Sequence, residues 1–218
     1  ISKHIVNALI ATEDERFKDH SGIDPKGTLR AIGTLGRAGG GSTITQQLAK
    51  ALLAQGQGSN KAWRVIEKIK EWVIAVKLER NFTKEEMIAL YLNAVPFSDN
   101  VFGIRNASRT FFQKEPDKVS VDQAAILIGM VNGPGIYNPR KYPDRSKERR
   151  NLVLSRMATN SYITEAEVTK YKALPIKLTY RKLDENTGFA PYFRDILKEE
   201  VKRELKQLKK PDGSNYDI

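Results

Sequence analysis

Two short runs of this sequence carry side chains that could do chemistry. The first is EDERFKDHSG at residues 13–22, and it places two carboxylates, Glu13 and Asp14, after an apolar segment with helical spacing. Glu13 lies one turn beyond Leu9, so we expect it close to the buried face of that helix. A half-buried carboxyl at such a position is suited to act as a general base.

The second run is GSTITQQLAK at residues 41–50, and it follows a glycine turn. It concentrates hydroxyl and amide groups, which donate and accept hydrogen bonds without charge, and it ends in a lysine. Neutral groups of this kind suit sugar hydroxyls and amides, and the cation suits a phosphate. The candidates for substrate contact here are Ser42, Thr43, Gln46, Gln47 and Lys50.

A third candidate surface lies on the helix predicted over residues 61–80. Its apolar residues gather on one side, and Arg64, Lys68 and Glu71 follow another. Spacing alone favours a solvated face with charge pairs at i and i+4, each worth about 0.3 kcal/mol. A functional role for Glu71 needs a second argument.

The elements that would position these residues are helices. Periodicity and N-cap signals predict them over residues 2–16, 26–35, 43–55, 61–80, 84–93, 120–131, 144–160, 164–172 and 188–208. Alternating strand patterns are scarce, and the only candidate strand is short, at residues 177–181. The sequence therefore indicates a mainly α fold with short loops.

Composition restricts the class of partner. The chain of 218 residues has 37 lysines and arginines against 26 acids, a formal net charge of +11. An anionic partner is expected: nucleic acid, a phospholipid surface or a pyrophosphate. The absence of cysteine excludes disulfides and thiolate metal sites. No stretch approaches the ~18 consecutive apolar residues of a spanning helix, and the start at Ile1 leads us to expect an excised or processed fragment.

Together the two runs resemble the signature of the peptidoglycan glycosyltransferase domain, glycosyltransferase family 51, of class A penicillin-binding proteins and monofunctional transglycosylases. Three more stretches are similar to later motifs of that family, in its order. They are KIKE at residues 68–71, EMIALYLN at residues 86–93, and YNP at residues 137–139 with RRNLVL at residues 149–154. The resemblance covers roughly residues 5–160.

The resemblance implies an architecture. It implies a lysozyme-like helical globular lobe with a smaller mobile lobe, residues 23–60, that faces the membrane. Residues 1–175 would form the glycosyltransferase domain. Residues 176–218 would form a C-terminal extension and the start of a linker to a missing transpeptidase domain, so the parent protein would be bifunctional.

The resemblance also implies a reaction. Lipid II would be polymerised into β-1,4 glycan strands, with inversion and release of undecaprenyl pyrophosphate. Glu13 would take the proton from the acceptor hydroxyl, and Glu71 would act on the donor side among Arg64 and Lys68. Lys50 and Lys68 would stabilise the departing pyrophosphate. No cofactor is required and no metal site is certain, although a divalent cation, magnesium or manganese, is an option at the pyrophosphate.

The implied partners are lipid II, the nascent lipid-linked glycan and the outer leaflet of the bacterial cytoplasmic membrane, with no nucleic acid. The enzyme would work at the extracytoplasmic, periplasmic face of that membrane. The resemblance also places Asp14, Phe17 and His20 among the substrate-binding residues. Each has a structural alternative: Asp14 could orient its neighbours, which we favour, Phe17 could belong to the core, which we also favour, and His20 could end a helix. Ser42 and Thr43 could be an N-cap pair.

Two other functions remain open at this stage. A lysozyme-like peptidoglycan hydrolase or lytic transglycosylase would also use a half-buried glutamate, but it would not need lysines for phosphate or a second glutamate on a cationic helix. A basic helical module that binds nucleic acid or membrane has only the net charge in its support, because the sequence shows no arginine-rich recognition helix.

Overall fold

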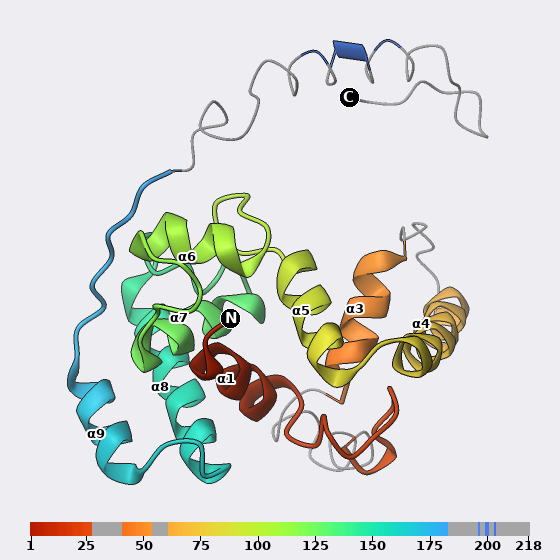
Figure 1. Ribbon diagram of the computed structural model, residues 1–218, viewed down its shortest axis with the longest axis horizontal. Helices are drawn as coiled ribbons and strands as arrows, with labels where there is room; N and C mark the ends of the chain where they lie inside the picture. The colour runs from red at the N-terminus through yellow and green to blue at the C-terminus, as the bar shows by residue number, and fades with distance from the viewer. Residues whose placement is uncertain (28–40, 54–60, 183–195, 197–198, 201–202, 204–218) are drawn as a thin grey trace. The chain divides into compact units, whose positions relative to one another are not determined.

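The computed structural model describes residues 1–27, 41–53, 61–182, 196, 199–200 and 203. The chain divides into two units, Ile1–Arg181 and Lys182–Ile218. The described residues of the first unit form α1 (Lys3–Glu13), α3 (Ile44–Leu52), α4 (Lys61–Asn81), α5 (Lys84–Ala94), α6 (Ile104–Phe112), α7 (Val121–Val131), α8 (Pro143–Thr159) and α9 (Glu165–Ala173) (Figure 1). Within these ranges no strand forms, only an isolated antiparallel bridge between Pro96 and Phe102. The prediction of a mainly helical fold is confirmed.

Side-chain caps fix where several helices begin. The hydroxyl of Ser2 accepts from the backbone N–H of His4 at 3.1 Å at the start of α1. Thr83 forms a capping box with Glu86 at the start of α5. α1 ends at Glu13, three residues before the predicted end, because Asp14 leaves the helical backbone with φ −160°. Glu13 is therefore the last helical residue before a loop.

The core is built around α7, which contacts α1, α6 and α8, while α9 packs on α8. α7 is apolar on most sides and contributes a continuous buried run, from Ala124 to Met130. The predicted buried face of α1 is confirmed, since Ile5 and Leu9 are fully buried. The helix that carries Glu13 is thus anchored in the hydrophobic core.

α4 lies with its charged side inward. α3 contacts both α4 and α5, and it faces the side of α4 that carries Glu71 and Ala75, which are 8% and 0% exposed. The apolar side instead faces outward, with Val65, Ile69 and Val73 each at least half exposed. The solvated-face interpretation that spacing alone favoured for Glu71 is therefore wrong. The small side chain of Ala75 lets α4 pack closely on α3. The side of α4 that carries the bulky apolar residues therefore faces away from α3.

Helix α6 was not predicted. It begins at Gly103 without a side-chain cap, and it ends at Gln113 in the left-handed conformation, so both boundary signals are missing. Its apolar spacing, with Ile104, Ala107 and Phe111 buried, was present in the sequence. The short strand predicted at residues 177–181 is instead an extended segment that donates two backbone hydrogen bonds, from Thr179 and Arg181, to the end of α6. Most of the helices predicted at 26–35 and 188–208 lies outside the described residues.

Candidate active site

A cleft of about 740 Å³ opens where the end of α1 meets α3, α4 and α5. It holds both predicted catalytic carboxylates, Glu13 and Glu71. Five of the predicted substrate-binding residues line it as well. The full lining is Glu13, Ser42, Gln46, Gln47, Lys50, Ala51, Leu53, Lys68, Glu71, Tyr91, Val95, Pro96, Val131 and Asn132.

Glu13 is held at the base of this cleft by neighbours on other helices. Its side chain is 9% exposed, and Oε2 accepts a hydrogen bond from Nε2 of Gln47 at 3.2 Å. Oε1 lies 3.6 Å from the guanidinium of Arg149 and accepts no hydrogen bond among the described residues. One carboxylate oxygen is thus fixed by a hydrogen bond, and the other is buried beside the guanidinium with an unused capacity to accept a hydrogen bond.

Glu71 has a different environment, because a cation is bonded to it. The ammonium of Lys68 donates to Oε2 of Glu71 at 2.8 Å and to the hydroxyl of Ser42 at 2.9 Å. Glu71 is nearly buried, whereas 38% of the Lys68 side chain is exposed. The ammonium of Lys68 is therefore partly open to solvent, and its position is fixed by the two hydrogen bonds to Glu71 and Ser42.

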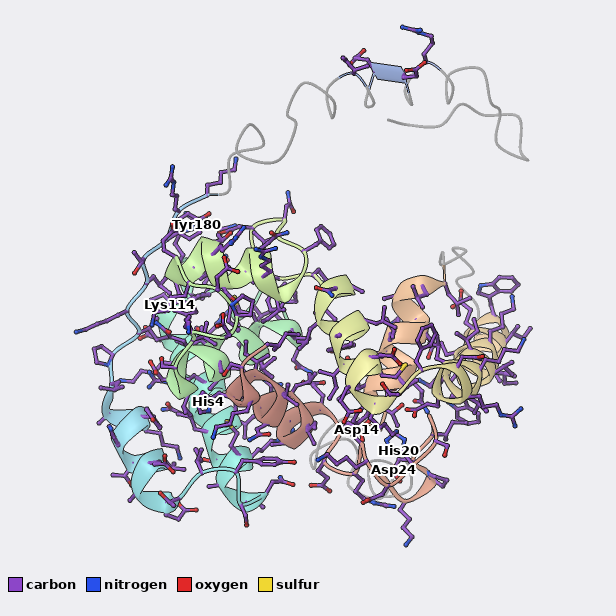
Figure 2. All side chains as sticks on the ribbon, viewed as in Figure 1. His4, Asp14, His20, Asp24, Lys114 and Tyr180 are labelled. Atoms are coloured by element: carbon purple, nitrogen blue, oxygen red, sulfur yellow. The ribbon has the colours of Figure 1, made fainter. Side chains whose placement is uncertain are left out.

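Asp14 and His20 lie close together and form a buried pair (Figure 2). Neither residue lines the cleft. Both carboxylate oxygens of Asp14 lie 3.0 Å from Nε2 of His20, and Oδ2 also accepts from the backbone N–H of Ile44 at 3.0 Å. Nδ1 of His20 accepts from the N–H of Gly22, so Nε2 carries the proton that is donated to Asp14. Asp14 therefore ties the end of α1 to the start of α3, which is the geometry of an orienting residue.

The loop after His20 is locked against both α3 and α4. The hydroxyl of Thr43, the N-cap of α3, donates to the carbonyl of Gly22 at 2.7 Å and accepts from the N–H of Gln46. Gly22 has φ +96°, and a Cβ at this position would lie 2.9 Å from the backbone of Ala75. Only glycine fits there. The structure places Thr43 as a cap outside the cleft.

Gln46 and Lys50 differ in how they line the cleft. Gln46 is 1% exposed, yet within the described chain neither its amide nitrogen nor its oxygen has a hydrogen-bond partner. An unpaired buried amide of this kind is costly, which favours a ligand that pairs with it. Lys50 is exposed in the last turn of α3 and supplies a second cation.

Phe17, like Asp14, His20 and Thr43, does not line the cleft. Phe17 is fully buried in the core, with the ammonium of Lys84 4.3 Å from its ring centroid. Its placement agrees with the core alternative. The side chain of Arg64 lies outside the described part of the structure, so its predicted role stays a prediction.

Two further residues lie around the Glu13 carboxylate: Arg149 next to it, and Tyr91 through the amide of Gln47. The sequence analysis assigned no role to either. The hydroxyl of Tyr91 donates to Oε1 of Gln47 at 2.9 Å. Burial, with the nearby charge of Glu13, raises the pKa of Tyr91 well above its usual value. Burial lowers the pKa of Arg149, and Glu13 partly opposes this effect. Both residues stand in the matched motifs, but only the fold shows that they meet Glu13.

The transglycosylase family profile matches residues 1–158 of the chain. The chain belongs to this family. Penicillin-binding protein 1A of Aquifex aeolicus is 39% identical over 206 residues, which are 92% of this chain and 27% of that protein. Penicillin-binding protein 2a of Streptococcus pneumoniae is 39% identical over 210 residues, 93% of this chain and 28% of that protein. Penicillin-binding protein 1A of Escherichia coli is 33% identical over 217 residues, 98% of this chain and 25% of that protein.

The transglycosylase match identifies the enzyme class of the chain. This chain is a peptidoglycan glycosyltransferase domain of the kind found in penicillin-binding protein 1A, a class that polymerises glycan strands. It spans 25–28% of the length of the three relatives named above. In the described part of the chain, no helix is long and apolar enough to cross a membrane, and no three acidic, histidine or cysteine side chains gather into a metal site.

Proposed function

We propose that this transglycosylase domain joins lipid II units, with Glu13 as the base and Glu71 with Lys68 at the leaving group. The observation that carries the proposal is that the two carboxylates line one cleft and have different partners. Glu13 has one oxygen without a hydrogen bond, whereas Glu71 is bonded to a cation. Two carboxyl groups in unlike environments can take unlike roles.

Glu13 would act on the acceptor sugar. Inversion at the anomeric carbon requires a base on the face opposite the leaving group. The carboxylate of Glu13 would take the proton of the acceptor 4-hydroxyl as the oxygen of that hydroxyl forms the new glycosidic bond. The bond from the anomeric carbon to the pyrophosphate oxygen breaks, and its electron pair leaves with undecaprenyl pyrophosphate.

Lys68 would stabilise the negative charge that develops on the leaving group. Its ammonium is held by Glu71 and Ser42 before any ligand binds, so little reorganisation is needed during the reaction. Lys50 would add a second positive charge from α3. A divalent cation at the pyrophosphate stays an optional part of the proposal. Glu71 could offer it one carboxylate, with phosphate oxygens as the other ligands.

The lobe arrangement and location are further parts of the proposal. We propose that residues 23–60, in which residues 28–40 and 54–60 lie outside the described chain, form a small lobe that faces the membrane, and that α4 extends this surface. The support is the exposed apolar side of α4 together with Leu52, which is 60% exposed. The domain would then work on lipid-linked substrate at the outer leaflet of the cytoplasmic membrane. Residues 1–175 would be the catalytic domain, and the rest would lead toward a transpeptidase domain.

The test is polymerisation of purified lipid II in detergent by the 218-residue chain and two variants, Glu13→Gln and Glu71→Gln. We expect glycan strands from the parent chain and at least a hundredfold loss of rate in each variant, because each loses a charge that the transition state needs. Glu85→Gln, an exposed acid in the first turn of α5, is the matched control and should retain the parent rate.

Other outcomes would reject the proposal. Cleavage of preformed glycan by the parent chain, without polymerisation, would establish the hydrolase alternative. A folded parent chain that neither polymerises nor cleaves would support a binding module. Full activity of Glu13→Gln would show that another group is the base.

A further inference from the structure

A chain of two hydrogen bonds runs from the interior of α5 to the carboxylate of Glu13. Tyr91 is 1% exposed, and its hydroxyl donates to Oε1 of Gln47 at 2.9 Å. Nε2 of the same amide donates to Oε2 of Glu13 at 3.2 Å. Three helices, α5, α3 and α1, each contribute one member.

The direction of these bonds is set by the chemistry of the three groups. An ionised carboxylate only accepts, so the amide must turn its N–H toward Glu13 and its oxygen toward Tyr91. The hydroxyl of Tyr91 then has to donate. A reversed amide would place its oxygen against an oxygen of Glu13, and two acceptors repel each other. Each member thus fixes the orientation of the next.

Tyr91 is able to keep the donor role at any pH at which the enzyme works. Burial, reinforced by the charge of Glu13, raises its pKa, so the hydroxyl stays protonated. The charged groups around Glu13 in the described chain are Arg149 from α8, at 3.6 Å, and Lys50, Lys68 and Glu71 in the cleft. Asp14, Glu15, Asp24 and Arg156 line a second, smaller cavity together with Glu13. These charged groups do not orient the Gln47 amide.

We propose that Tyr91 is a positioning residue that acts through Gln47, fixes Oε2 of Glu13, and holds Glu13 as a carboxylate. This inference rests on the proposed role of Glu13 as the base. It adds a residue, Tyr91, and it distinguishes the two oxygens of the base. Oε2 is the fixed oxygen because it accepts the amide bond, and Oε1 has no hydrogen-bond donor among the described residues.

Tyr91→Phe tests the proposal, because it removes one oxygen atom and keeps the ring. Without the hydroxyl, the amide can turn its oxygen toward Glu13, which favours the protonated carboxyl. We expect kcat to fall about tenfold with KM within about twofold of the parent value, and the acidic limb of the rate profile to move to higher pH. Tyr162→Phe is the matched control, since Tyr162 packs against the core and does not line the cleft.

A double variant shows whether Tyr91 works through Gln47. If it does, Tyr91→Phe causes no further loss of kcat in a Gln47→Ala background, because the link is already broken. An equal loss in both backgrounds would overturn the proposal. So would a Tyr91→Phe variant that keeps the parent pH profile.

A readout without substrate separates this inference from the proposed function. Carbon-13 NMR of the labelled glutamate carboxyl, with the signal of Glu13 assigned from Glu13→Gln, reports its protonation directly. In Tyr91→Phe the midpoint of that titration should move to higher pH, and in Tyr162→Phe it should not. An unchanged midpoint in Tyr91→Phe overturns the positioning role whether or not the chain polymerises lipid II. An inactive parent chain with a shifted midpoint in Tyr91→Phe would instead reject only the proposed function.

Discussion

The ammonium group of Lys68 contacts Glu71 and Ser42 at once, and both contacts are direct hydrogen bonds. The neighbouring Lys70 has a different position, with its ammonium 5.4 Å from the ring centroid of Trp63. Two lysines separated by one residue therefore point to different surroundings on the same helix. Only the first is placed to meet an anionic substrate in the cleft.

The different surroundings of Lys68 and Lys70 allow a test in which a substitution of Lys70 is the control. We expect Lys68→Met to lower kcat/KM for lipid II at least a hundredfold, because the developing negative charge loses a fixed cation. Lys70→Met should change it less than threefold. Initial rates of glycan formation measure both. Similar losses in the two variants would show that overall positive charge, not the position of Lys68, is what matters.

Sequence reasoning succeeded for residues whose position depends on their own helix. Glu13 follows the buried side of α1, so helical periodicity was sufficient to place it near the core. Tyr91 and Arg149 were not found, because their relation to Glu13 depends on how α5 and α8 pack against α1 and α3. Gln46 and Gln47 were both singled out, but only the fold distinguishes the unpaired amide from the one that binds Glu13.

At the scale of elements, the buried Arg150 joins α8 to the end of α9. Its guanidinium is fully buried and donates to the carbonyls of Lys172 and Leu174, and burial lowers its pKa. These carbonyls belong to the C-terminal end of a helix, where they have no partners within the helix. Arg150 is therefore a structural residue, although it stands beside Arg149 in the same motif.

We expect Arg150→Met to lower the free energy of unfolding by about 3 kcal/mol, because buried carbonyls lose their charged donor. Urea unfolding followed by circular dichroism measures the change. Arg145→Met on the exposed part of the same helix, where the guanidinium lies over the Tyr142 ring, is the control and should cost less than about 0.5 kcal/mol. Equal stability of the two variants would contradict the structural role.

Two elements show why helix prediction from the sequence was incomplete. α6 lacked the polar N-cap on which the predicted starts relied, since Gly103 begins it. For α4 the periodicity predicted the helix correctly, but it did not determine which side of the helix packs against the rest of the protein. An apolar stripe normally faces a core, and here the opposite side packs on α3.

At the scale of the whole molecule, the exposed apolar side of α4 accompanies a strongly basic composition. The formal net charge is +11, and among the side chains of α4 that the structure describes, the large exposed apolar ones are Val65, Ile66, Ile69, Trp72 and Val73. Basic charge attracts an anionic lipid surface, and an apolar stripe can enter it. The two features together support the proposed membrane-facing surface.

The prediction is that the double variant Ile69→Ser with Val73→Ser binds phospholipid vesicles at least tenfold more weakly, because less apolar area leaves water. Co-sedimentation with vesicles of mixed neutral and anionic lipid measures this. Leu152→Ser, at an exposed apolar position on α8, is the control and should bind like the parent chain. Unchanged binding of the double variant would mean that α4 does not enter the lipid.

The contact of Gly22 with Ala75 sets how closely the loop after α1 can approach α4. Gly22 follows the loop that starts after Glu13, and Ala75 lies one turn of α4 after Glu71, so the two backbones meet at a fixed separation. A methyl group at Gly22 would clash with the backbone of Ala75 and push the loop away from α4. The hydrogen atom of Gly22 is therefore what lets the two backbones meet, and even the smallest side chain there would force apart the loop after Glu13 and the part of α4 that follows Glu71.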